Sequence, residues 1–204
     1  MKIFPENKIL IATHNIGKLE EFKYILKDLD LEILSSKDLN LDEPIETENT
    51  FIGNARIKSK SSCLQSNIPS LADDSGLQVH ALGNKPGVYT ADWAFTENGR
   101  DFKKAMHRVW NELLECKKKK PFTANFICTL VLTFPNGNEK IFEGSVNGSI
   151  NWPIRGIDGH GYDPMFVPDG YRKTFGEMTN SEKNKISHRN IALKKFITFY
   201  NNNS

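Results

Sequence analysis

Two adjacent carboxylates, Asp73 and Asp74, follow the apolar run from Ile68 to Ala72. Neighbouring carboxylates repel one another unless a cation lies beside them. Mg²⁺ prefers oxygen ligands and keeps several bound waters, and a carboxylate beside such a water can accept its proton. The pair therefore indicates either metal-assisted hydrolysis or a plain Asp-Asp-Ser-Gly surface turn, which is a common use of these residue types.

A candidate phosphate site lies at Thr13 to Lys18, between an apolar run and a helical pattern. The free N–H groups at a helix N-terminus favour anions. Lys18 would add a positive charge, and Thr13 and Asn15 can donate to phosphate oxygens. The segment is not a Walker A loop, because Leu19 stands where that motif has Ser or Thr. A plain strand-to-helix turn with a solvated lysine is the alternative.

Three further segments carry residue types that could contact a ligand. Glu46 and Glu48 precede a predicted helix, where carboxylates either cap the helix or complete a metal site. Gly159 to Pro164 places glycines on both sides of His160, which allows close approach of a ligand, and an aromatic ring there could stack on a base. Ser187 is expected to cap the last helix, with His188, Arg189 and Lys183 close by in the sequence.

These segments depend on strands and helices that the periodicity predicts. Strands are expected at 8–12, 32–34, 68–72, 122–134 and 139–146, and helices at 19–29, 50–65, 102–114 and from 187 onward. Asp73 to Gly76 is expected as a turn at a strand end, and 151–169 as irregular. Pro135-Asn136-Gly137 between two strand-like runs predicts a hairpin. Alternating strands and helices with one hairpin indicate an α/β fold with a mixed sheet.

The composition excludes several classes of protein. The formal net charge of 204 residues is +2, which does not favour a nucleic-acid binder, and the run Lys117 to Lys120 is expected to be a solvated linker. Three cysteines without C-x-x-C spacing argue against a disulfide framework or a zinc site. The apolar runs are too short for a signal peptide or a membrane span. We expect a soluble, cytoplasmic protein without nucleic-acid or membrane partners.

Taken in order, these segments resemble the inosine triphosphate pyrophosphatase family, over about residues 8–193. The motifs are T-x-N-x-G-K from Thr13, ADDSGL from Ala72, PGVY from Pro86, GYDP from Gly161 and SHR from Ser187. The resemblance implies an elongated, two-lobed α/β fold around a central mixed sheet, one domain spanning 1–204, a homodimer, and a nucleotide in the cleft. It also implies Mg²⁺-dependent hydrolysis of dITP, ITP and XTP to a nucleoside monophosphate and pyrophosphate.

The resemblance carries roles to individual residues. Asp74 is the implied catalytic residue and metal ligand, and Glu46 the second metal ligand. The implied phosphate-binding residues are Thr13, His14, Asn15, Ile16, Gly17 and Lys18. Ser75 and Lys183 would contact phosphate or sugar, and the base would lie among His160, Gly161, Tyr162, Asp163, His188 and Arg189.

Three residues depart from the family pattern: His14 replaces Gly, Gly53 replaces Glu, and His160 replaces Phe. His is one of the better-tolerated residues if position 14 needs a positive φ. Gly53 removes a carboxylate and weakens a helix. These departures leave open a nucleotide-binding regulator with little turnover, and a related pyrophosphatase with another base preference is a further alternative.

Overall fold

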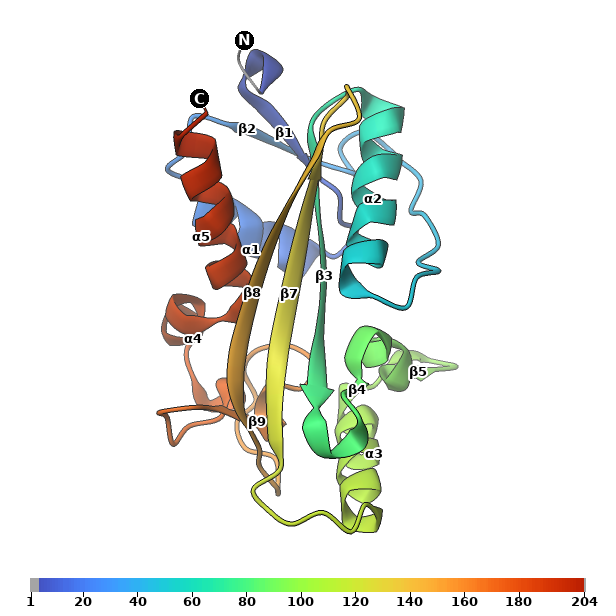
Figure 1. Ribbon diagram of the computed structural model, residues 1–204, viewed down its shortest axis with the longest axis vertical. Coiled ribbons are helices and arrows are strands. Elements are labelled where there is room, and N and C mark those ends of the chain that lie inside the picture. Colours follow the sequence, from blue (N-terminus) through green and yellow to red (C-terminus); the bar gives the residue numbers. More distant parts are fainter. Residues whose placement is uncertain (1–3, 204) are drawn as a thin grey trace. The chain divides into compact units, whose positions relative to one another are not determined.

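The protein has a mixed α/β fold, whose elements are labelled in Figure 1. The computed structural model describes residues 4–203. Its strands are β1 (Lys8–Ile11), β2 (Glu32–Ser35), β3 (Ser70–Val79), β4 (Lys85–Pro86), β5 (Phe95–Thr96), β6 (Gly99–Arg100), β7 (Thr123–Thr133), β8 (Glu139–Ile150) and β9 (Phe166–Pro168). Its α-helices are α1 (Ile16–Leu26), α2 (Phe51–Ser66), α3 (Phe102–Glu115), α4 (Asn180–Ile186) and α5 (His188–Asn201). Short 3-10 helices lie at Pro5–Asn7, His80–Leu82, Gly87–Thr90, Asp92–Ala94, Asp163–Met165 and Phe175–Glu177.

The central sheet combines parallel and antiparallel pairs. Its strand order is β2-β1-β3-β7-β8-β9, with β4 paired to β3. Strand β1 runs parallel to β2 and β3, whereas β4 is antiparallel to β3 and β9 is antiparallel to β8. The short strands β5 and β6 form a separate antiparallel pair. The predicted α/β class with a central mixed sheet is therefore confirmed.

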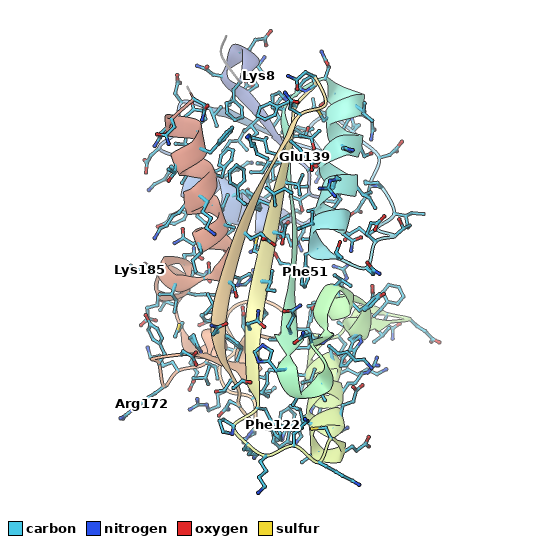
Figure 2. All side chains as sticks on the ribbon, in the orientation of Figure 1. Lys8, Phe51, Phe122, Glu139, Arg172 and Lys185 are labelled. Carbon is cyan, nitrogen blue, oxygen red and sulfur yellow. The ribbon has the colours of Figure 1, made fainter. Side chains whose placement is uncertain are left out.

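The chain divides into two compact units, and the first holds the phosphate segment and the carboxylate pair. It comprises the described residues up to Asp74, then Cys128–Gly144, and those from Asn190 onward. One apolar cluster of this unit includes Ile9 of β1, Phe22 of α1 and Phe196 of α5, all fully buried. Figure 1 shows α2 and α5 on opposite sides of the strands, and Figure 2 labels Phe51, the first residue of α2. Helices therefore cover both faces of the sheet in this unit.

The second unit holds the Gly-rich segment and the residues before α5. It comprises Ser75–Ile127 and Ser145–Arg189. Its core brings together Leu77 of β3, Val109 of α3 and the aromatic side chains of Tyr162, Phe166 and Phe175, all fully buried. The strands β3, β7 and β8 contribute residues to both units.

Several sequence predictions are confirmed. Helix α3 covers the predicted 102–114, and the predicted hairpin turn connects β7 to β8, with Gly137 at a φ of 86° and its N–H 2.9 Å from the Phe134 carbonyl. Thr50 caps α2 by accepting a hydrogen bond from Gly53 N. Within residues 4–203, no helix combines the length and the apolar character needed to cross a membrane.

Other predictions of local structure are wrong. Asp73 to Gly76 lies inside the ten-residue strand β3, not in a turn, and β9 lies within the stretch predicted to be irregular. Helix α4 is missed by the periodicity because it is short and polar, and Ser187 is its C-cap. Ser187 also directly precedes α5, which begins at His188 near the predicted start, and its capping of α5 stays a prediction. A capping box starts α4: Thr179 Oγ1 accepts from Glu182 N, and Glu182 Oε2 accepts from Thr179 N.

Candidate functional site

The phosphate segment of the first unit forms the N-terminus of α1. Asn15 is its N-cap, and Asn15 Oδ1 accepts a hydrogen bond from Lys18 N at 3.1 Å. Thr13 Oγ1 accepts from Asn15 N at 3.2 Å. Ile16 and Gly17 are exposed and open the helix. Since the first N–H groups of an α-helix have no partner within the helix, this turn suits an anion.

His14 connects this segment to the loop before α2. Its Nε2 lies 3.1 Å from the Leu41 carbonyl oxygen, and its Nδ1 lies 3.7 Å from Glu43 Oε1. The described non-glycine residues with positive φ do not include His14. The replacement of glycine at this position is therefore compatible with ordinary backbone conformation, and the imidazole binds the neighbouring loop.

The carboxylates of Asp73 and Asp74 are both buried, with 2% and 7% of their surface exposed. Successive side chains of a strand point to opposite faces, and these two have different partners accordingly. Lys18 Nζ lies 2.9 Å from Asp73 Oδ2. Asn54 Nδ2 of α2 donates to Asp74 Oδ2 at 3.3 Å. Aspartate has a low β-propensity, yet both residues lie in a strand, because α1 and α2 supply polar partners for their carboxylates.

Lys58 of α2 lies among three carboxylates. Its Nζ contacts Glu46 Oε1 at 3.0 Å, and only 11% of its side chain is exposed. Burial alone would lower the pKa of Lys58, but Asp73, Asp74 and Glu46 together raise it above its ordinary value. Glu46, which the resemblance assigns to metal, is therefore electrostatically part of the same cluster.

The carboxyl of Asp74 has a pKa far above its ordinary value. Burial, the largest cause, raises its pKa to about 7, and the negative charges of Glu46 and Asp73 act in the same direction. Lys58 and Lys18 oppose the rise. A carboxyl that takes up a proton near neutral pH is suited to acid–base chemistry.

The donor set of this cluster fits a hard divalent cation. Three carboxylates act on one another here, and a cation would relieve their repulsion. The described residues contain no cluster of three or more His, Cys, Asp or Glu side chains arranged as a complete metal site. Mg²⁺ is commonly held by one or two carboxylates together with waters and substrate phosphates, so a complete set of three protein ligands is not required for it.

A second polar cluster lies in the second unit. Asp163 Oδ2 accepts from Lys183 Nζ and from the backbone N–H of His160, both at 2.6 Å. Asp163 and Lys183 are 1% and 8% exposed, whereas the His160 side chain is exposed. The φ of Gly159 is +81°, and a Cβ there would lie 2.2 Å from Asp163 Oδ2. Glycine at this position is what allows the loop to close over the Asp163 carboxylate.

Other predicted base-binding residues are packed into this unit. Tyr162 is fully buried, and its hydroxyl donates to the Thr90 carbonyl oxygen at 3.1 Å. The His188 ring stacks on Phe126, with ring centroids 4.9 Å apart and planes at 10°. Arg189 is buried, and Ser75 is partly buried in β3 directly after Asp74. Tyr162 therefore has a structural contact through its side chain, and its predicted contact with a base stays a prediction.

Comparison with known proteins identifies the family. The sequence pattern of the Ham1 family matches residues 9–199. The chain belongs to the Ham1 family. A Ham1-family relative from Ruegeria pomeroyi, named dITP/XTP pyrophosphatase, is 51% identical over 196 residues, 96% of each chain. The Ham1 protein of Coxiella burnetii has a TM-score of 0.89 at 32% identity, covering 96% of this chain and 98% of its own. The Ham1 protein of Staphylococcus aureus has a TM-score of 0.86 at 32% identity, covering 97% and 100%.

The Ham1 fold brings two residues to the carboxylates that sequence reasoning did not single out. Asn54 and Lys58 lie one helical turn apart on α2, and both reach the cluster. Their spacing of four residues places them on one helix face, which was the available signal. The sequence alone does not predict which face of α2 contacts Asp74.

Proposed function

We propose that this chain hydrolyses deaminated purine nucleoside triphosphates, dITP, ITP and XTP, to the monophosphate and pyrophosphate. The observation that carries the proposal is the 51% identity, over nearly the full length of both chains, to a relative named dITP/XTP pyrophosphatase. The buried Asp73-Asp74 pair with Lys18, Lys58 and Glu46 supports it, because these groups match the needs of phosphate-anhydride hydrolysis.

For the metal, we propose Mg²⁺ held by Glu46 and Asp74. Members of the family are generally metal-dependent, and the two carboxylates fit a cation that also takes substrate oxygens and waters. When bound, Mg²⁺ would offset the charge of the triphosphate and of the leaving pyrophosphate.

The side chains of the first unit supply the remaining chemistry. Asp74 accepts a proton from the attacking water, for which a pKa near neutrality is favourable. The water oxygen bonds to the α-phosphorus, and the bond from that phosphorus to the bridging oxygen of the β-phosphate breaks. Lys18, at the N-terminus of α1, binds phosphate oxygens with Thr13, Asn15 and the helix N–H groups. The products are the nucleoside monophosphate and pyrophosphate.

For base selection, we propose the buried donors of the second unit. Hypoxanthine and xanthine have an O6 acceptor where adenine has an amino donor, so a donor such as Arg189 would accept the first and reject the second. An unpaired buried donor costs about 1–3 kcal/mol. Guanine also has O6 and must be refused at its 2-amino group. The contacts of His160, Asp163 and His188 with the base and of Lys183 with phosphate or sugar stay predictions of the family resemblance, as do the homodimer and the cytoplasmic location.

The test is product analysis with ITP, XTP, ATP, GTP and dUTP, with and without Mg²⁺. We expect pyrophosphate and monophosphate from ITP and XTP only with metal. In H₂¹⁸O the label should appear in the monophosphate, because the attack is at the α-phosphorus. Release of orthophosphate would contradict this mechanism. Asp74→Asn should abolish turnover while sparing nucleotide binding, and ITP binding by the unsubstituted chain without turnover would favour the regulator instead.

A further inference from the structure

The first turn of α2 lacks the Glu or Gln side chain that completes a capping box. Thr50 is the N-cap, and its Oγ1 accepts a hydrogen bond from Gly53 N at 3.0 Å. In a capping box the residue at this third helical position is Glu or Gln, whose side chain returns to the N-cap. Gly53 cannot do so, and glycine also weakens a helix at this point. A compensating reason for glycine must lie in its surroundings.

Glu48 occupies the space beside Gly53. A Cβ placed on Gly53 would lie 2.5 Å from Glu48 Cβ and 2.7 Å from Glu48 Cγ, closer than real contacts allow. Gly53 has no positive φ that would require glycine. A Cβ there would also lie 2.9 Å from Thr50 Oγ1. Glycine is therefore needed at position 53 for space, and the nearest atoms in that space are Cβ and Cγ of Glu48.

The backbone of Glu48 is connected to the catalytic carboxylate through one buried amide. Glu48 N donates to Asn54 Oδ1 at 2.9 Å, and Asn54 Nδ2 donates to Asp74 Oδ2 at 3.3 Å. Asn54 is 5% exposed. A backbone N–H can only donate, so it fixes Oδ1 toward Glu48 and leaves Nδ2 for Asp74. The amide thus joins the end of the loop that carries Glu46 to Asp74.

We propose that Glu48, seated on Gly53, is a positioning residue that holds the Glu46 loop against α2 and Asp74. We call the contacts of Glu48 with Gly53 and Asn54 the Glu48 latch. Its consequence for metal binding rests on the proposed function, because Glu46 and Asp74 are the proposed ligands. Residues that orient metal ligands typically change metal affinity or activity about 10–100-fold when replaced.

A substitution cycle on the metal-free chain tests the latch without reference to activity. Gly53→Ala should lower the Tm of the unsubstituted protein, because the new methyl group displaces Glu48. In a Glu48→Gly background the same change should raise the Tm, because alanine favours a helix over glycine. Thr47→Gly is the matched background: it adds a glycine to the same loop, and Gly53→Ala should still lower the Tm there. A rise in the Tm of the unsubstituted protein on Gly53→Ala would overturn the latch.

Metal binding tests the proposed role of the Glu48 latch. Mn²⁺ binding, followed by electron paramagnetic resonance without nucleotide, should weaken about tenfold in Glu48→Gly. Glu48→Gln keeps the aliphatic stem of the side chain and should bind Mn²⁺ as the unsubstituted chain does. If Mn²⁺ binding weakened as much in Glu48→Gln as in Glu48→Gly, Glu48 would act through its charge on the metal, and the positioning role would be wrong. Hydrogen exchange of residues 43–49 should increase in Glu48→Gly alone. If the unsubstituted chain bound no Mn²⁺, the proposed metal dependence would fail, while the Tm cycle and the exchange would still decide the latch.

Discussion

Lys18 Nζ lies 3.1 Å from Oδ1 and 2.9 Å from Oδ2 of Asp73, so one ammonium contacts both oxygens of a buried carboxylate. This pair links the N-terminus of α1 to the part of β3 that belongs to the first compact unit. It gives Asp73 a role different from that of Asp74. Asp73 holds the ammonium of Lys18, while Asp74 accepts from the amide of Asn54 and is influenced by the charge of Lys58.

Asp73→Asn should therefore act mainly on stability and on the placement of Lys18. We expect the free energy of unfolding at pH 7 to fall by about 1.5–3 kcal/mol, the range for a hydrogen bond to a charged group. The KM for ITP should rise, and kcat should fall much less than in Asp74→Asn. Urea unfolding and steady-state kinetics measure the two effects. A loss of kcat as complete as that of Asp74→Asn would show that Asp73 takes part in the chemical step.

Asp74→Asn should stabilise the metal-free protein at high pH. The folded-state pKa of Asp74, about 7, lies above its ordinary value of 3.8. The folded state therefore binds the extra proton between these values, and stability falls as the pH rises through this range. Asparagine carries no charge and avoids that loss. We expect a higher Tm than the unsubstituted protein at pH 8 in EDTA, and little difference near pH 4.

Metal supplies the control for that experiment. Saturating Mg²⁺ should raise the Tm of the unsubstituted protein at pH 8, because a ligand that binds only the folded state stabilises it. The same addition should leave Asp74→Asn nearly unchanged. A Tm difference between the two proteins that did not vary with pH would contradict the raised pKa of Asp74.

The carboxylate pair also shows a feature that the sequence alone did not predict, its strand conformation. Asp, Ser and Gly are depleted in strands, so Asp73 to Gly76 was predicted as a turn. Tertiary contacts outweigh this low strand propensity, because Lys18 and Asn54 come from helices distant in the sequence. The motif order, in contrast, predicted the family, and the alternation of strands and helices with one hairpin predicted the mixed sheet.

Other elements were missed for reasons that can be named. Helix α4 has no apolar period, although Thr179 and Glu182 have the spacing of a capping box. Glu48 was weighed only as a cap or a metal ligand, since its contact with Gly53 depends on the path of the loop before α2. Side-chain packing of this kind has no signal in one sequence.

Lys58→Met should move the pH dependence of stability in the metal-free protein. The positive charge of Lys58 holds down the pKa of Asp74, so its loss should raise that pKa further above its ordinary value. In EDTA, the fall in Tm with rising pH should then continue to higher pH than in the unsubstituted protein. Lys60→Met is the matched control, because Lys60 is an exposed lysine of the same helix. A profile that moved equally in both variants would mean that the shift comes from the net charge of the protein.

Lys183→Met should be strongly destabilising, because it leaves the carboxylate of Asp163 buried without its cation. Lys183 Nζ lies 2.6 Å from Asp163 Oδ2, and their side chains are only 11% and 2% exposed. Removing one partner of a buried pair costs about 3–5 kcal/mol, which urea unfolding at pH 7 would detect. Lys183→Met/Asp163→Asn should recover part of this loss, because the uncompensated charge is gone. If the stability losses of Lys183→Met and Asp163→Asn simply added in the double variant, the ion pair would not hold the Gly-rich loop. The hydrogen bond from His160 N would then be the main contact of the loop with Asp163.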